Sequence, residues 1–293
     1  MVFEGVYTAI VTPFENGQID VNSLTRVVEA QLAAGITGIV ACGTTGESAT
    51  LSDDEIIAVT RHVLEVSRGE CQVIAGVGSN ATAHTCTLLG RAQELGVDGA
   101  LVITPYYNKP SQSGLVAHFE AVSSHAKDLP LMLYTVPGRT GVSLDVNTFE
   151  RLSRLSNVVS LKDATADLAL SAEYIAAAQG RATILSGDDI TALPLWTVGG
   201  RGVVSVAANL CPDLMMALWQ ANEAGAVADA ATLHQRLVPL FRSLFVESNP
   251  SPAKYLMAQV GLIEREDLRL PLVPVGASSR ELLSQCFADL GLS

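Results

Sequence analysis

The chain has 293 residues, of which 48% are apolar and 16% charged, and its 30 acidic side chains exceed the 18 basic ones to give a formal charge of −12. This length suits a single α/β barrel of about 250 residues followed by a tail. The high apolar fraction excludes a largely disordered chain. The acidic balance disfavours a nucleic-acid partner, because no basic stripe is available to neutralise a run of phosphates.

Targeting segments and cysteines narrow the cellular setting. No apolar run approaches the ~18 charge-free residues of a membrane helix, and the opening stretch MVFEGVYTAI lacks the basic start and apolar core of a signal peptide. We therefore predict a cytoplasmic protein without a membrane partner. The five cysteines are scattered and form no CxxC pair, which is typical of reduced structural thiols rather than of disulfides or a zinc site. Cys42, beside a glycine-rich turn, leaves a functional role open.

Short apolar runs rich in β-branched residues alternate with segments of helical periodicity over the first two thirds of the chain. Near-continuous apolar strands predict a sheet buried on both faces, and the repeat of about 20 to 34 residues is the length of a strand plus a crossover helix. The predicted strands begin at Val6, Gly38, Gln72, Gly99, Leu131, Val158, Thr183 and Gly202. The predicted helices between them span residues 21–34, 53–66, 83–95, 114–125, 148–155, 168–178 and 192–198.

Eight strand–helix units in one chain predict a (β/α)8 TIM barrel. An open flavodoxin-like or Rossmann sheet is the weaker alternative, because no GxGxxG motif follows the first strand and GVGSNA after the third is only a partial match. After Leu210 the alternation stops, and helices are predicted over residues 213–225, 227–245, 253–260 and 280–290. We therefore predict a catalytic barrel over residues 1–210 and a C-terminal helical extension over residues 211–293, which we expect to serve assembly.

In this architecture the catalytic side chains lie at the carboxyl ends of the strands. All five histidines fall in predicted helices instead, which disfavours a metal-dependent reaction and a serine triad, and no GxSxG elbow is present. The sequence accordingly predicts neither a metal nor a cofactor. The polar candidates that follow the apolar runs are Thr8, Thr12, Thr44, Thr45, Glu47, Asn80, Tyr106, Tyr107, Tyr134, Arg139, Lys162, Asp163, Thr165, Asp188, Asp189, Ser205 and Asn209.

Lysine is the most informative residue type in this set. Only four lysines occur, namely Lys109, Lys127, Lys162 and Lys254. Three have ordinary explanations in a turn, in a loop and at the start of a predicted helix. Lys162 differs, because it ends the apolar run VVSLK, where an unpaired ammonium would carry a heavy desolvation penalty. One interpretation is an ion pair with Asp163 or Asp188, and the other is an amine nucleophile that forms an imine with a carbonyl substrate.

Imine formation requires a neutral amine, yet at an unperturbed pKa of about 10.4 only about one lysine in a thousand or fewer is neutral at pH 7. Lowering that pKa by ~3 units takes about 4 kcal/mol, which desolvation inside a barrel can supply. A proton relay must also dehydrate the carbinolamine. Tyr107, Tyr134 and the paired threonines offer hydroxyls at neighbouring strand ends, although each of them alone is equally explained by packing or by a turn.

Two further motifs predict carboxylate binding. GTTGES (residues 43–48) is a tight turn directly after a strand, and successive N–H groups in such a turn form a concavity for a carboxylate. Its simpler interpretation is a strand-to-helix turn in which Ser52 caps the next helix. Arg139 in VPGRT follows the fifth strand, where it could clamp a second carboxylate through two hydrogen bonds or form a salt bridge at the rim.

With these residues assembled, the sequence resembles the dihydrodipicolinate synthase (4-hydroxy-tetrahydrodipicolinate synthase) family, within the class I pyruvate aldolase superfamily that includes N-acetylneuraminate lyase. The resemblance runs essentially end to end, and Arg139 favours the synthases because related aldolases usually lack it. The matching segments are AIVTPF, GTTGESATL, VIAGVGSNAT, TPYYNKPSQSGL, LYTVPGRTG, SLKDAT, LSGDD, GVVSVAAN, LFVESNPSPAKYLM and LRLPLVP.

The resemblance implies a reaction and its substrates. Lys162 would form a Schiff base with pyruvate, the backbone at Thr44 and Thr45 would hold the pyruvate carboxylate, and Val204 would contact pyruvate through its carbonyl. Arg139 matches the residue that binds L-aspartate 4-semialdehyde. The implied reaction is the condensation of pyruvate with that semialdehyde, followed by cyclisation, in the diaminopimelate route to lysine.

The resemblance also implies a proton relay and an assembly. Tyr134 matches the proton donor and acceptor, and Thr44 and Tyr107 match the rest of the relay. Tyr107 is typically lent by the neighbouring subunit. The usual state of the family is a homotetramer built from tight dimers.

Two departures from the family pattern bear on these expectations. The residue after the active-site tyrosine is commonly Asn and is Thr135 in this chain, which we expect to shift local hydrogen bonding without removing a catalytic group. In lysine-sensitive members, the feedback site has a pair of histidines and a Glu where this chain has Asp53, Ile56 and His84. The site's other positions match, and they are Ser48, Ala49, Asn80 and Tyr106. We therefore predict weak or absent inhibition by lysine.

Two other functions stay open at this point. One is a different pyruvate–lysine aldolase, similar to N-acetylneuraminate lyase or to aldolases of 2-keto-3-deoxy sugar acids, against which Arg139 discriminates. The other is a catalytically silent barrel that only binds a keto acid or an amino acid.

Overall fold

A computed structural model describes residues 2–292 and contains a strand at each of the eight predicted apolar runs. The eight strands form one closed barrel in the order β1-β10-β9-β8-β7-β6-β5-β4, and their pairing is parallel from β5 through β10 and between β1 and β4. The predicted (β/α)8 fold is thereby confirmed. The strands are β1 (Gly5–Ala9), β4 (Gly38–Ala41), β5 (Gln72–Gly76), β6 (Gly99–Ile103), β7 (Leu131–Thr135), β8 (Val158–Asp163), β9 (Thr183–Ser186) and β10 (Gly202–Ser205).

The chain divides into two compact units. The first comprises Ile74–Val204 together with the chain up to Gly5, and the second comprises Val6–Val73 together with the chain from Ser205 onward. The predicted division into a catalytic barrel over residues 1–210 and a helical extension over residues 211–293 stays a prediction.

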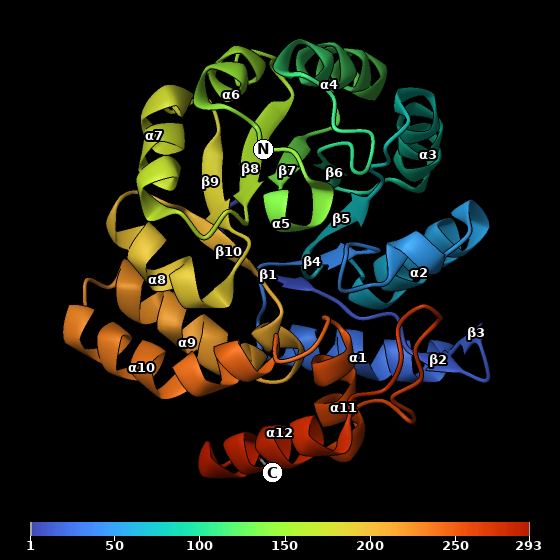
Figure 1. Cartoon of the computed structure of the whole chain (residues 1–293), viewed down its shortest axis with the longest axis vertical. Coiled ribbons are helices and arrows are strands. Elements are labelled where there is room, and N and C mark those ends of the chain that lie inside the picture. Colours follow the sequence, from blue (N-terminus) through green and yellow to red (C-terminus); the bar gives the residue numbers. More distant parts are fainter. Residues whose placement is uncertain (1, 293) are drawn as a thin grey trace. The chain divides into compact units, whose positions relative to one another are not determined.

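The first unit carries strands β6 to β9 side by side, with helices along their outer face (Figure 1). Strands β7 and β8 are in register such that Tyr134 lies opposite Lys162 and Thr135 lies opposite Asp163. The helices of this unit are α3 (Thr82–Leu95), α4 (Gln112–Ala126), α5 (Pro137–Thr140), α6 (Val146–Leu152), α7 (Leu168–Ala178) and α8 (Asp189–Thr197). The four-residue helix α5 was not predicted, because one turn is too short to show a periodicity.

The second unit pairs β1 with β4 in parallel and adds a hairpin of two short strands. The hairpin, β2 (Phe14–Glu15) and β3 (Gln18–Ile19), was also missed by the sequence analysis. The helices of this unit are α1 (Val21–Ala33), α2 (Asp53–Ser67), α9 (Pro212–Glu223), α10 (Val227–Ser243), α11 (Ser251–Gln259) and α12 (Ala277–Asp289), and its 3-10 turns are η1 (Ser48–Thr50) and η2 (Ala207–Asn209).

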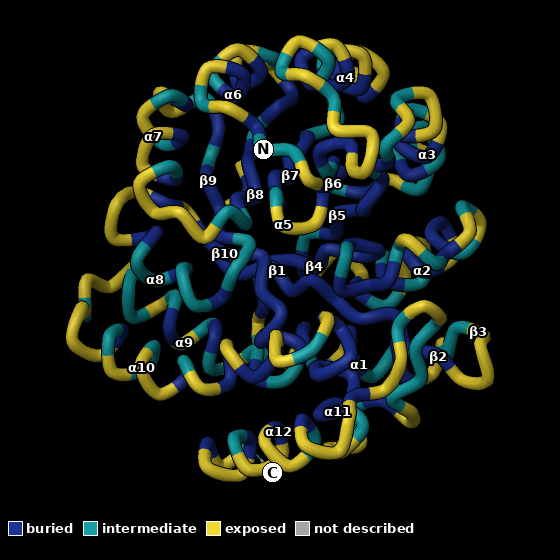
Figure 2. Tube along the Cα trace, viewed as in Figure 1, coloured by how far each residue is buried: buried dark blue, intermediate teal, exposed yellow. Residues whose placement is uncertain are grey.

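The burial pattern explains why the strands could be predicted. Strands β1, β4 and β7 are buried at every position, and Figure 2 shows the barrel strands as mostly buried and the outward faces of the helices as exposed. A strand covered on both faces needs apolar side chains on both, which produces a continuous apolar run instead of an alternating one. Among residues 2–292, no helix has the length and apolar character needed to cross a membrane.

Candidate active site

Lys162 is the next-to-last residue of β8, and only 5% of its surface is exposed. Its ammonium nitrogen lies 4.3 Å from the centroid of the Tyr134 ring. This contact follows from the register, since Tyr134 is the partner of Lys162 on β7 and opposite residues in neighbouring strands project to the same face. The structure therefore brings together the two residues that the sequence assigned as nucleophile and proton donor.

The environment of Lys162 favours its neutral form. Burial lowers the pKa of Lys162 from 10.5 to about 7, the carboxylate of Asp189 opposes the shift, and the charge of Arg139 adds to it. Loss of water around an ammonium disfavours the charged state, whereas a nearby carboxylate favours it. An appreciable fraction of Lys162 is thus a free amine at neutral pH.

The carboxylate that affects the pKa of Lys162 belongs to Asp189, and not to Asp163 or Asp188, which the sequence analysis considered. Asp163 directs its carboxylate to other partners, accepting from the backbone N–H of Thr165 at 3.0 Å and from the Ser171 hydroxyl at 2.6 Å. Asp188 caps helix α8 by accepting from the N–H of Ile190 at 3.4 Å. Asp189, the first residue of α8, is 1% exposed and is the carboxylate whose charge raises the pKa of Lys162.

Gly187 supports the aliphatic stem of Lys162. A Cβ atom at position 187 would lie 3.1 Å from Cε of Lys162 and 2.7 Å from Cβ of Ala164. The N–H of Gly187 donates to the carbonyl of Asp163 at 2.7 Å, which fixes this approach. A larger residue at this position would displace Ala164 and press against the stem of Lys162.

Arg139 lies on α5, directly after β7, and is exposed. Thr135, the last residue of β7, is fully buried, and its hydroxyl accepts from the N–H of Leu144 at 3.4 Å. Val204, near the end of β10, is 1% exposed. These residues belong to the first unit, as Lys162 does.

Tyr107 stands apart from the residues packed around Lys162. Its side chain is 89% exposed, and its backbone has a φ of 72°, a left-handed conformation that is unusual for a residue other than glycine. The N–H of Tyr107 donates to the carbonyl of Thr140 at 3.3 Å. The loop therefore presents an aromatic side chain outward.

The turn of residues 43–48 belongs to the second unit and is closed by hydrogen bonds from Glu47 to Thr44 and from Ser48 to Gly43. In the part of the chain that the structure describes, the backbone N–H groups of Thr44 and Thr45 donate to no protein acceptor. Two adjacent N–H groups of this kind form a concavity for an anionic group. The predicted cap is also present, because Ser52 and Glu55 form a reciprocal capping box at the start of α2.

Three comparisons relate this geometry to known proteins. A model of the dihydrodipicolinate synthetase family matches residues 2–289. The chain belongs to this family. The 4-hydroxy-tetrahydrodipicolinate synthase of Magnetococcus marinus is 45% identical over 99% of both chains. Among solved structures, dihydrodipicolinate synthase from Thermotoga maritima superposes with a TM-score of 0.97 at 39% identity over 100% of both chains. The chloride-inhibited dihydrodipicolinate synthase of Acinetobacter baumannii, complexed with pyruvate, does so with a TM-score of 0.95 at 41% identity over 99% of both chains.

Some of the residues that match the lysine feedback site of the family belong to the first unit, and the others belong to the second. His84 is near the start of α3, where its Nδ1 lies 3.2 Å from the Ser79 hydroxyl, and the carbonyl of Asn80 accepts from the Asn108 side chain at 2.8 Å. Tyr106 is 37% exposed. The candidate residues in the second unit are Ser48 and Ala49, which lie in η1, and Asp53 and Ile56, which lie in α2.

The cysteines of this family member are free thiols, as expected. Burial raises the pKa of Cys42 to about 12, and its thiol lies 3.7 Å from the carbonyl of Ile56. A thiol held in its neutral form is a poor nucleophile. The functional role left open for Cys42 is therefore not supported.

Sequence reasoning missed one buried charged residue. Lys254 was explained as the start of a helix, yet its side chain is completely buried in α11 and paired with Glu47. The only available signal was the position of a lysine among the apolar residues of PSPAKYLM.

Proposed function

We propose that this chain is a 4-hydroxy-tetrahydrodipicolinate synthase that condenses pyruvate with L-aspartate 4-semialdehyde through a Schiff base on Lys162. The curated relatives that carry this name are similar over the full chain. The observation within the molecule that carries the proposal is the amine of Lys162, which is buried against Tyr134 with a pKa of about 7.

The chemistry begins with the neutral amine of Lys162. It attacks the keto carbon of pyruvate to give a carbinolamine, which loses water to form the imine. Removal of a methyl proton converts the imine to an enamine, whose carbon forms a bond to the aldehyde carbon of the semialdehyde. The amino group of the semialdehyde then attacks the imine carbon, which closes the ring and releases Lys162 as an amine.

Proton transfer is assigned to hydroxyl groups. The phenol of Tyr134, whose ring lies against Lys162, is suited to donate the proton that leaves with water and to take it back. The family resemblance supports Thr44 and Tyr107 as the remainder of the relay. Because Tyr107 is 89% exposed in the single chain, its contribution fits a site completed by a second subunit.

Substrate binding is assigned to groups that recognise carboxylates. The N–H groups of Thr44 and Thr45 would hold the carboxylate of pyruvate, and the carbonyl of Val204 would contact the same substrate. The exposed guanidinium of Arg139 would bind the carboxylate of the semialdehyde, which a planar cation can do through two parallel hydrogen bonds.

We further propose that the protein acts as a cytoplasmic homotetramer built from dimers. The outward-facing Tyr107 supports the dimer, and the five free thiols are typical of a reducing compartment.

Borohydride trapping with pyruvate tests the proposal. Reduction should add one pyruvate-derived group to the chain, and mass spectrometry of peptides should place it on Lys162. No adduct, or an adduct on another lysine, would refute the mechanism. A coupled assay with alternative aldehydes then separates this synthase from another pyruvate aldolase, since only the synthase should prefer the semialdehyde.

A further inference from the structure

The segment of residues 249–269 makes polar contacts to residues 45–55, which include most of the proposed carboxylate-binding turn and the start of α2. Both segments belong to the second unit. Three side chains of the segment make these contacts, namely Asn249, Lys254 and Arg269. We refer to these three residues as the C-terminal clamp.

The central contact is a buried ion pair. The Lys254 ammonium binds Oε1 of Glu47 and also donates to the carbonyl of Asp267 at 2.9 Å, and both paired side chains are 0% exposed. The second oxygen of Glu47 accepts from the backbone N–H of Arg269 at 3.2 Å. Both oxygens of one buried carboxylate are thus occupied by the C-terminal segment.

Glu47 needs such restraint because of its backbone. Its φ of 54° and ψ of 35° are left-handed, and Cys42 at the other end of the turn has a φ of 54° as well. Residues other than glycine occupy this region only when their surroundings impose it. The ion pair supplies that constraint at the residue where the turn leaves the proposed carboxylate site.

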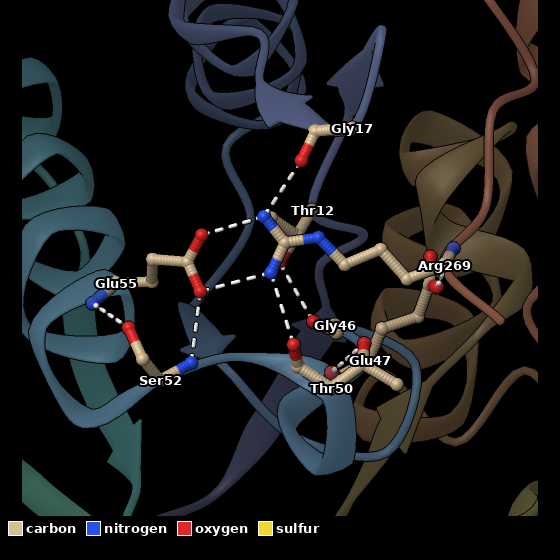
Figure 3. A network of polar contacts seen from close by, with 8 residues as sticks. All are labelled: Thr12, Gly17, Gly46, Glu47, Thr50, Ser52, Glu55 and Arg269. Atoms are coloured by element: carbon tan, nitrogen blue, oxygen red, sulfur yellow. Dashed lines mark hydrogen bonds and ion pairs between the residues drawn. The ribbon is translucent and has the colours of Figure 1, made fainter.

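Arg269 holds the segment that follows the turn (Figure 3). Its guanidinium donates to the carbonyl of Thr50 at 2.9 Å, to Oε2 of Glu55 at 2.8 Å and to the carbonyl of Gly17 at 2.8 Å. Glu55 in turn accepts from the N–H of Ser52 at 2.8 Å. One guanidinium therefore connects η1, the start of α2 and the β2–β3 hairpin.

Two further contacts reach the turn, at Thr45 and Gly46. The Asn249 side-chain amide donates to the Thr45 hydroxyl at 3.0 Å, and the Thr12 hydroxyl donates to the carbonyl of Gly46 at 2.7 Å. The ring of Phe14 contacts both cations of the clamp, with its centroid 4.2 Å from the Lys254 nitrogen and 4.5 Å from the Arg269 guanidinium carbon.

A buried ion pair is on balance no more stabilising than well-packed apolar residues. Its use at this turn therefore calls for a geometric explanation. We propose that Lys254, Asn249 and Arg269 are positioning residues that hold the Thr44–Thr45 backbone in the conformation that binds the substrate carboxylate. The inference rests on the proposed function, because it assigns the turn to pyruvate.

The test compares two carbonyl probes, of which only one carries a negative charge. Pyruvate carries a carboxylate, and methyl pyruvate presents the same keto group without one. The rate of borohydride-trapped adduct formation at Lys162 is measured against the concentration of each probe, for the wild type and for Lys254→Met. The matched control is Arg280→Met, which removes a cation from the same unit that pairs with Glu266 and does not touch the turn.

We expect Lys254→Met to raise the half-saturating pyruvate concentration about tenfold or more, because a displacement of about 1 Å can cost about 100-fold. Trapping with methyl pyruvate should change less than about twofold on the same reasoning, since that probe makes no use of the turn. Arg280→Met should behave as the wild type with both probes.

A second variant covers the case in which Lys254→Met does not fold. Asn249→Ala removes one neutral hydrogen bond to the turn, so it should raise the half-saturating pyruvate concentration about fivefold and leave methyl pyruvate unaffected. If both probes weaken together, or neither does, the clamp has no positioning role. If the wild type forms no pyruvate adduct at Lys162, both the proposed function and this inference are refuted. If the wild type forms the adduct and the variants respond equally to both probes, only this inference is refuted.

Discussion

The amine of Lys162 lies over the ring of Tyr134, 4.3 Å from its centroid, and the two residues are partners in the β7–β8 register. A one-residue slip between these strands would turn the two side chains to opposite faces. The pairing of the two strands therefore sets the distance between the proposed nucleophile and the proposed proton donor.

Two charged neighbours should tune the pH dependence of imine formation in opposite directions. Asp189 raises the pKa of Lys162 and Arg139 lowers it. Asp189→Asn should therefore lower the apparent pKa of adduct formation with pyruvate and speed the reaction at pH 6, and Arg139→Met should raise it and slow the reaction at pH 6. The measurement is the rate of adduct formation with pyruvate alone from pH 5.5 to 9, quenched with borohydride. Equal pH–rate profiles for the wild type and the two variants would contradict this prediction.

The free energy of unfolding should also depend on the protonation of Lys162. The pKa of Lys162 is about 7 when folded and 10.5 when unfolded, so below pH 7 both states are protonated and burial of the ammonium opposes folding. The penalty is relieved as the pH rises from about 7 towards 10.5. Relative to Lys162→Met, the free energy of unfolding of the wild type should therefore increase by about 2 kcal/mol between pH 7 and 9. Urea denaturation of both proteins at each pH measures this, and the difference cancels the titration of Lys254.

Arg139→Ala should separate the two substrates. The variant should keep the pyruvate adduct at Lys162 but lose about 100-fold in kcat/KM for the semialdehyde, as expected for loss of a charged, hydrogen-bonded partner. Arg154→Ala is the control, since it removes an exposed arginine that pairs with Glu150 in the same unit. Unchanged turnover in Arg139→Ala would remove this residue from the acceptor site.

The exposed Tyr107 predicts recovery of activity between two inactive variants. If Tyr107 serves the site of a partner subunit, mixing Lys162→Ala with Tyr107→Phe and allowing subunits to exchange should restore one intact site in each mixed dimer. About a quarter of all sites should recover, since half of the dimers are mixed and half of their sites are intact. Lys162→Ala mixed with Tyr134→Phe is the control and should recover nothing, because these two residues act within one chain. Equal recovery in both mixtures would exclude sharing.

Lysine should inhibit only weakly. A neutral or cationic His84 cannot replace a carboxylate that faces the amine of the ligand. We expect a half-maximal lysine concentration above about 1 mM, which corresponds to less than about 4 kcal/mol of binding. His84→Glu should lower this concentration in steady-state assays. Strong inhibition of the wild type would show that other residues supply the missing charge.

The parts of the fold that could be predicted are those in which a local pattern carries the whole signal. Seven of the eight strands begin at the predicted residue, since burial on both faces requires a run of apolar side chains. Helix α7 (Leu168–Ala178) matches its predicted range, and local features bound it: the Asp167 side chain caps its first turn, and Gln179 after its last residue is left-handed. Strands of two residues, such as β2, are too short to show any pattern.

In the candidate site, the residues that could be predicted are likewise those with a local signal in the sequence. Lys162 is conspicuous because a charge interrupts an apolar strand. The identity of its carboxylate neighbour depends on how the β9–α8 turn aims Asp188 and Asp189, which residue spacing does not encode. The partner of Lys254 lies 207 positions away in the chain, so only the tertiary structure could pair it with Glu47.

The burial of the thiols has a practical consequence for spectroscopy. Cys42, Cys71 and Cys211 are buried, and Cys86 and Cys286 are partly accessible. Cys86 lies on α3 in the first unit, and Cys286 lies on α12 in the second. The native chain therefore offers one attachment point for a dye or spin label in each unit. A label at Cys86 reports on the surroundings of α3, and a label at Cys286 reports on the surroundings of α12, without any engineered cysteine.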